Sequence, residues 1–281
     1  MRAKSIFLAA LILAGCAGAP KPAGPPRLHA ALEAENDGAK RYARGDFGMA
    51  ERRFDEAMRL YASIDDAPGR TRNRLHLART RLAQGRDEAA LDLLNAAPPD
   101  AEPGPALDTL LLKAQAQLAL GRDADAQQIL AAATGRCGAA CPQAASLNLL
   151  QARAALAGKR PQDALAHAEA ALKLLRDTGE AVETGNAWRM IAATRFAAGD
   201  AAGALPAAEA ALDIDRRLAL PEKIAGDWLL IGDIRRKVGA GDTAAAYQRA
   251  LEVANAAHLS GIAGIATQAL AGLGTAGSTS R

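Results

Sequence analysis

The strongest constraint on the fold is an internal repeat of about 40 residues that runs through most of the 281-residue chain. Small residues recur at spacings of 40, 36, 38, 40, 40 and 40. These residues are Gly38, Ala78, Ala114, Ala152, Ala192, Gly232 and Gly272. A fixed period of this length is typical of solenoids, in which each unit buries its apolar face by stacking on its neighbours.

Each unit carries further columns at fixed distances from its small residue. A glycine follows six or seven residues later (Gly45, Gly85, Gly121, Gly158, Gly199, Gly239), and an alanine follows twelve residues later. Two helices joined by a tight turn explain both columns, because glycine ends a helix without strain and small residues let a second helix approach closely. The composition agrees, since alanine and leucine carry an apolar content of 50% while aromatic residues make up 3%.

The order of small residue, glycine, aromatic residue, alanine, aromatic residue and alanine resembles the tetratricopeptide repeat. The first unit shows it most fully, as Gly38, Gly45, Phe47, Ala50, Phe54 and Ala57. Trp188 and Trp228 stand at the aromatic position of the first helix. The resemblance implies an all-α, right-handed helical solenoid of about six helix pairs over residues 31–274, closed by a C-terminal capping helix.

The chain departs from that family in two ways. Its period exceeds the usual value of roughly 34 residues, which implies longer helices or longer loops. The sixth unit fits worst, because Arg236 and Gln248 occupy apolar columns. We therefore expect its second helix to be shifted or slightly shortened, and residues 275–281 to form a disordered tail.

Residues 1–15 have the pattern of a secretory leader. Arg2 and Lys4 precede an apolar run from Ile6 to Ala14, which is too short to span a bilayer as a helix. The run ends in Leu13-Ala14-Gly15-Cys16, which resembles the lipobox of bacterial lipoproteins. The resemblance implies that Cys16 carries the lipid, palmitate included, that anchors the mature chain. Because Ala17 rather than an aspartate follows it, we expect the periplasmic face of the outer membrane.

A proline-rich linker follows Cys16. Residues 17–26 contain four prolines, which cannot sustain a helix interior, so we expect a semi-stiff tether within residues 16–30. Removal of the leader takes away two cations and leaves 32 − 31 = +1 from the 34 Lys+Arg and 31 Asp+Glu of the full chain. This charge offers no footprint for nucleic acid.

Cys137 and Cys141 lie close together in the loop between the third and fourth units. Outside the cytoplasm such a pair indicates a structural disulfide. Free cysteines and a reactive thiol pair remain alternatives, although the spacing is not the Cys-x-x-Cys of redox motifs.

No catalytic, cofactor or metal motif emerges from the sequence. The four histidines are scattered, and no His-Glu-x-x-His or Gly-x-Ser-x-Gly occurs. The Gly-x-Gly-x-x-Gly at residues 272–277 has neither a preceding strand nor a following helix, both of which its phosphate-binding mechanism requires. We therefore predict a protein that is not an enzyme.

The first helices of the units are expected to line a groove. By helical phase, polar residues of this groove are Arg72, Arg79, Arg153, Asn186 and Arg189. Their arginines suit carboxylates or a peptide C-terminus, whereas an ordinary solvated helix face is the alternative.

Together these features predict a lipid-anchored adaptor for a protein or peptide partner in the cell envelope, for example in pilus, envelope or peptidoglycan-machinery assembly. The alternatives are a self-assembling structural lipoprotein and a thiol redox factor.

Overall fold

The computed structural model describes residues 25–96, 103–138, 141–176, 178–239 and 241–276. Within these ranges the chain forms thirteen α-helices and no strand. In chain order the helices are α1 (Pro26–Ala43), α2 (Phe47–Ala62), α3 (Ala67–Ala83), α4 (Asp87–Asn95), α5 (Pro103–Ala119), α6 (Asp123–Arg136), α7 (Ala144–Ala157), α8 (Pro161–Leu175), α9 (Ala181–Ala197), α10 (Ala201–Arg217), α11 (Pro221–Val238), α12 (Thr243–Ala256) and α13 (Ser260–Ala276). The all-α class predicted from the repeat is confirmed.

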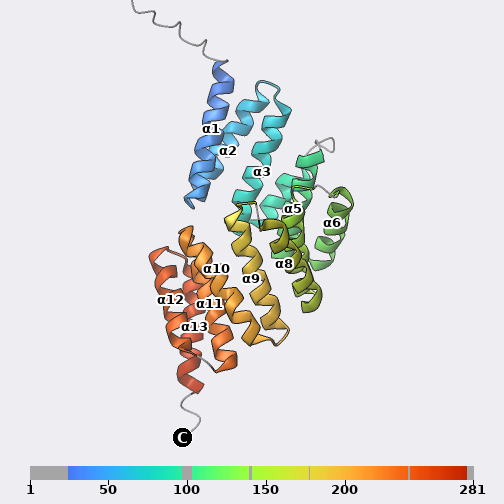
Figure 1. The fold of residues 1–281 in the computed structure, drawn as a ribbon. Helices are drawn as coiled ribbons and strands as arrows, with labels where there is room; N and C mark the ends of the chain where they lie inside the picture. Colours follow the sequence, from blue (N-terminus) through green and yellow to red (C-terminus); the bar gives the residue numbers. More distant parts are fainter. Residues whose placement is uncertain (1–24, 97–102, 139–140, 177, 240, 277–281) are drawn as a thin grey trace, which may run out of the picture.

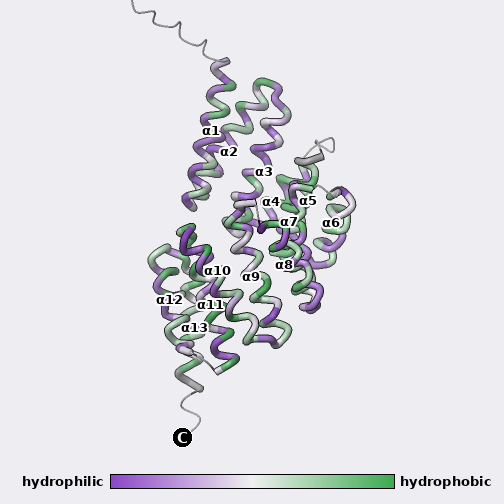
Figure 2. Tube along the Cα trace, viewed as in Figure 1, coloured by the Kyte–Doolittle hydropathy of each residue, from purple (hydrophilic) through white to green (hydrophobic). Residues whose placement is uncertain are grey.

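The helices stack as six pairs, from α1 with α2 to α11 with α12, and α13 packs on the last pair. Each described helix contacts its first or second neighbours in the chain and no helix further away. Figure 1 shows the consequence, a stack in which α1 and α13 lie at opposite ends. Figure 2 shows hydrophobic and hydrophilic residues alternating along the helices, as expected when one side of each helix is buried.

The small-residue column lies where the two helices of a pair cross. A methyl group added at Gly38 would stand 2.8 Å from ring carbons of Phe54, and one added at Gly232 would overlap the ring of Tyr247. The alanines of the same column in the second to fifth units are fully buried. The small residue therefore sets how closely the helices of a pair approach, as predicted.

Five of the six predicted turn glycines have a left-handed backbone, with φ between 63° and 87°. The fourth unit differs, because Lys159 takes this conformation with φ of 56°, whereas Gly158 has φ of −75°. The assignment of Gly158 as the left-handed turn residue was therefore wrong. The residue with the left-handed backbone lies seven residues after the small residue in every unit. Gly158 lies only six residues after Ala152, so it stands one residue too early.

The ends of the solenoid differ slightly from the predicted limits. Helix α1 begins at Pro26, so residues 26–30 belong to the folded part rather than to the linker. Proline is favourable in the first helical turn, since its missing N–H would have no partner there. Helix α13 continues to Ala276, two residues into the predicted tail. Residues 1–24, which include the predicted leader and Cys16, and residues 277–281 lie outside the described residues.

The second helix of the sixth unit is shifted by one residue relative to the repeat, as predicted. Tyr247, Ala250 and Ala254 are buried, and Gln248 in the expected apolar column is exposed. Gly239 and Gly241, which both have positive φ, form the turn before this helix. A two-glycine turn accommodates the altered register that brings Tyr247 against Gly232.

Two glycines of α11 test the role of the small-residue column. Gly232→Ala should lower the free energy of unfolding by about 1–3 kcal/mol, because the added methyl group overlaps the Tyr247 ring. Gly226→Ala on the same helix meets open space and should raise it by up to about 1 kcal/mol through helix propensity. Urea unfolding followed by circular dichroism measures both variants, and equal changes in the two would contradict the close-approach explanation.

Candidate functional site

The odd-numbered helices form one continuous face of the solenoid, which we call the inner face. Each described odd-numbered helix contacts the next one, from α1 with α3 to α11 with α13. The even-numbered helices make no such contacts with one another over the described residues. The odd-numbered helices therefore lie on the shorter side of the stack, where the predicted groove residues were expected.

Arg72 of α3 contributes to a polar cluster near the start of the solenoid, which we call the N-terminal junction. Its centre is Glu35 of α1, which accepts hydrogen bonds from Arg72 Nε at 2.6 Å, Tyr61 Oη at 2.6 Å and Asn73 Nδ2 at 3.1 Å. Tyr61 and Asn73 are almost completely buried, and the Arg72 guanidinium also lies over the Tyr61 ring. The cluster thereby joins α1, α2 and α3.

The hydrogen bonds of this junction determine its protonation. Burial alone would raise the pKa of Glu35, but the bonds from Arg72, Tyr61 and Asn73 outweigh it and lower the pKa to about 2. Burial and the neighbouring Glu35 carboxylate raise the pKa of Tyr61 to about 12. Glu35 is therefore a carboxylate and Tyr61 a phenol at neutral pH.

Arg189 of α9 is the centre of a second cluster, which we call the C-terminal junction. Its central group is a cation, whereas the central group of the N-terminal junction is the Glu35 carboxylate. The Nε of Arg189 donates to Asp227 Oδ1 at 2.6 Å, and its Nη2 donates to Asp215. Both aspartates are fully buried. Asn186 Oδ1 accepts from Arg189 Nη1 at 2.9 Å and from the Lys223 ammonium. This cluster joins α9, α10 and α11.

Two carboxylates share one guanidinium in the C-terminal junction. Burial is the main reason that the pKa of Asp227 rises to about 6, and the charge of Asp215 adds to it against the effect of Arg189. Burial, and then the charge of Arg189, lower the pKa of Lys223. The pKa of Asp227 in the C-terminal junction is therefore closer to neutral pH than the pKa of Glu35 in the N-terminal junction.

The two junctions occupy equivalent places in the repeat. Glu35 and Tyr61 are 26 residues apart, as are Arg189 and Asp215, and the third member follows 38 residues after the first in both cases. In the third unit this place is filled by Leu111, Cys137 and Leu147, and in the fourth by Leu149, Leu175 and Ala187. The place is therefore polar near both ends of the solenoid and apolar in its middle.

The predicted groove residues consequently have different roles. Arg72 and Arg189 spend much of their hydrogen-bonding capacity on neighbouring helices. Asn186 is bonded to Glu183 and Arg189 of its own helix and to Lys223 of α11. Arg79 of α3 has a longer contact, 3.8 Å, to Asp108 of α5. Arg153 of α7 is exposed and forms no hydrogen bond or ion pair with the described residues. It is the member of the predicted set whose charge is free for an external ligand.

The sequence did not reveal six contributors to the two junctions, namely Glu35, Tyr61, Asn73, Asp215, Lys223 and Asp227. Phase had been applied to the first helices alone, whereas the junction also takes a residue from the end of the second helix and one from the next first helix. The recurring 26-residue and 38-residue separations of polar residues were the available signal.

Cys137 and Cys141 form a disulfide in the structure, with their Cα atoms 5.1 Å apart. Both lie against the apolar cluster of α5, α6 and α7. The bond closes a short loop at the end of α6.

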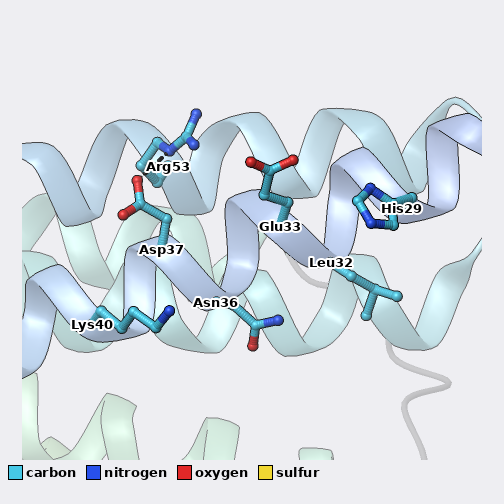
Figure 3. A pocket seen from close by; sticks show the side chains of 7 residues that line it. All are labelled: His29, Leu32, Glu33, Asn36, Asp37, Lys40 and Arg53. Atoms are coloured by element: carbon cyan, nitrogen blue, oxygen red, sulfur yellow. Dashed lines mark hydrogen bonds and ion pairs between the residues drawn. The ribbon is translucent and has the colours of Figure 1, made fainter.

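The surface of α1 carries a shallow depression of about 610 Å³. Figure 3 shows that six of its residues lie along one side of α1, with Arg53 of α2 beside Asp37. The Arg53 Nε and an Asp37 carboxylate oxygen are 2.6 Å apart. This side is mostly polar, as expected for the outer face of a terminal repeat that no further unit covers.

The described residues contain no cluster of three or more His, Cys, Asp or Glu side chains arranged to hold a metal ion. Among the described helices, none combines the length and apolarity that crossing a membrane requires.

The two junctions predict opposite responses to acid. The pKa of Asp227 is raised, so folding should become more favourable as pH falls from about 6 towards 4. The pKa of Glu35 is lowered, so its contribution, on the order of 2 kcal/mol, should be present above about pH 4.5 and be lost as pH falls towards 2. Denaturant unfolding at a series of pH values should show that Asp227→Asn removes the first change and Glu35→Gln weakens the second. Identical pH profiles for both variants would contradict this assignment.

Comparison with known proteins relates this helical stack to a repeat family and to solved structures of similar fold. Residues 48–111 match the tetratricopeptide repeat family. No curated protein matches over any part of the chain. Solved structures resemble its fold, among them the apo form of RapI, with a TM-score of 0.61, 14% identity, and coverage of 85% of this chain and 69% of that one.

A signal transduction ATPase with a tetratricopeptide repeat sensor from Pyrococcus horikoshii gives a TM-score of 0.63 at 14% identity, with 85% of this chain matching 37% of that one. A thermophilic tetratricopeptide repeat protein from Thermus thermophilus gives 0.52 at 21% identity, over 67% of this chain and 97% of that one. At these identities the likeness concerns the fold. The chain is thus an all-α helical solenoid of the tetratricopeptide repeat type.

Proposed function

We propose that this chain is a lipid-anchored adaptor that binds a protein or peptide partner of the cell envelope on its inner face. The observation that carries the proposal is the uninterrupted face of odd-numbered helices, on which Arg153 stays exposed while Arg72 and Arg189 are paired within the chain. Solenoids of this type present an extended concave surface for binding. A scaffold for protein partners is the function that this fold supports.

The inner face suits a partner that carries carboxylates. Arg153 forms no internal ion pair over the described residues, and Arg79 has one long contact to Asp108. Lys223 donates to the Asn186 amide oxygen and pairs with no described carboxylate. An acidic side chain or a peptide C-terminus would satisfy these cations with charge-assisted hydrogen bonds. Leu149 beside Arg153 adds apolar surface on the same helix face.

The anchor in this proposal is Cys16, ten residues before the start of α1. The supporting feature is the sequence Leu13-Ala14-Gly15-Cys16 after a short apolar run. Several acyl chains at one site hold a protein to a bilayer stably, whereas a single chain does not. The solenoid would then face the periplasm from the outer membrane, and the proline-rich residues 17–25 would give a reach of roughly 30 Å.

The anchor is tested by Cys16→Ser in the native host. The wild-type chain should incorporate a clickable palmitate analogue and sediment with outer membranes, because the lipidated cysteine becomes the anchored N-terminus. The variant should lose the label and leave the membrane fraction. Cys137→Ser/Cys141→Ser serves as the matched control and should keep the label. A wild-type chain that takes up no label would disprove lipid anchoring.

The inner face is tested by in-cell crosslinking of the tagged full-length chain, followed by mass spectrometry of the proteins that co-purify. One dominant envelope protein should crosslink to the wild type and decrease at least tenfold with Arg153→Glu, since the reversal repels a carboxylate. Arg136→Glu, an equal charge change on an exposed residue of α6, should retain it. Equal capture by both variants would exclude Arg153 from the binding face.

A further inference from the structure

Arg70 and Arg74 of α3 are two arginines without a counter-charge. Neither side chain forms a hydrogen bond or an ion pair with the described residues. The Nε of Arg70 and the Nη1 of Arg74 are nevertheless buried and have no acceptor. Buried N–H groups without a partner are rare in folded proteins, and each one calls for an explanation.

The other arginines near them on α3 are paired with carboxylates. Arg81 Nε lies 3.1 Å from Glu51, Arg72 Nε lies 2.6 Å from Glu35, and Arg79 has its contact with Asp108. Arg70 and Arg74 stand one helical turn apart, where like charges repel each other. Burial is the main cause that lowers the pKa of Arg74, and the charge of Arg70 adds to it. Among the described residues, the lack of an ion pair thus distinguishes Arg70 and Arg74 from Arg72, Arg79 and Arg81 of the same helix.

The pair lies on the side of α3 that faces away from the inner face. At 100° per residue, Arg70 and Arg74 are each about 200° from Arg72, and Arg74 is about 140° from Arg79. Arg74 also stands four residues before the small residue Ala78, which is the place that Trp188 and Trp228 occupy in α9 and α11. A cation thus replaces an aromatic ring at this place, and both side chains of the pair are half-buried.

We propose that Arg70 and Arg74 form a second binding site, separate from the inner face, which takes the carboxylate of an acidic side chain from a protein partner. The guanidinium fork matches the planar, two-oxygen geometry of a carboxylate. One carboxylate bound at the accessible part of the pair supplies the counter-charge that the described residues do not. The arrangement is the inverse of the C-terminal junction, where two carboxylates share the guanidinium of Arg189.

An Asp or Glu side chain fits this position because both arginines are half-buried cations without an ion pair among the described residues. A protruding side chain reaches into such a place, whereas a flat, hydrated surface does not. A partner seated here would leave the inner face free. The chain would therefore contact two acidic segments at once, one on each side of its N-terminal half.

The probe for this site is a fluorescent glutamate-rich peptide with an amidated C-terminus, titrated into the full-length chain and followed by anisotropy. Arg70→Gln/Arg74→Gln should weaken binding at least tenfold, because the variant lacks both forks. Arg44→Gln/Arg176→Gln removes the same charge from two exposed arginines and should bind as the wild type does. Arg70→Lys/Arg74→Lys keeps the charge without the fork, and should bind between these limits.

Inorganic phosphate is the second arm of the experiment. Phosphate that competes fully with the peptide at equal concentration would overturn the carboxylate assignment in favour of a phosphate site. Equal loss of binding in both glutamine variants would overturn the site itself, because it would reduce the effect to net charge. Peptide binding that is retained by Arg70→Gln/Arg74→Gln but lost with Arg153→Glu would place the peptide on the inner face and also overturn it.

Discussion

The close approach of two helices at one small residue is the contact on which the rest of the solenoid depends. Where Gly38 faces Phe54 and Gly232 faces Tyr247, the ring of one helix packs on the backbone of the other. Such packing leaves no room for a methyl group and so fixes both the separation and the register of the pair. Alanine fills the same column in the intervening units, with smaller partners such as Ala168 and Ala208 opposite. Every later feature, including the spacing of the junctions, repeats because this contact repeats.

The junctions add specificity to a core that is otherwise built largely from alanine and leucine. Cores of such uniform composition pack adequately in more than one register. The buried Asp215 and Asp227 must meet Arg189, and Glu35 must meet Tyr61 and Asn73. Each set is satisfied in one alignment of three helices. Misalignment would leave a buried charge unpaired, which is costly. The polar clusters thereby mark the register near the two ends, where fewer neighbouring units enforce it.

Much of this fold could be predicted from the sequence, because the repeat is marked by small residues that act between two consecutive helices. The number of helix pairs, the capping helix and the shift around Tyr247 all follow from spacing along one chain segment. The left-handed turn at Lys159 was missed because glycine identity was followed rather than position. Arg72 and Arg189 could be assigned to the inner face by helical phase. Their partners could not, since Glu35 and Asp227 come from other units and phase along one helix does not say what a neighbouring helix offers.

The Arg70 and Arg74 pair also shows that a sequence does not reveal which side chains of neighbouring helices lie near a residue. In the sequence it is one more pair of cations on an arginine-rich helix, and its significance depends on the missing acid around it. Only a structure shows which arginines of α3 have found partners. The free cations Arg153, Arg70 and Arg74 therefore carry more functional information than the larger number that are paired.

The restriction of contacts to first and second neighbours has a mechanical meaning. No described helix braces another across the length of the stack, so bending stiffness comes from one interface at a time. A force applied at α1, the end nearest the proposed anchor, is transmitted from each helix pair to the next. Small rotations at each interface add up over six pairs, so the curvature of the inner face can change while each pair stays intact.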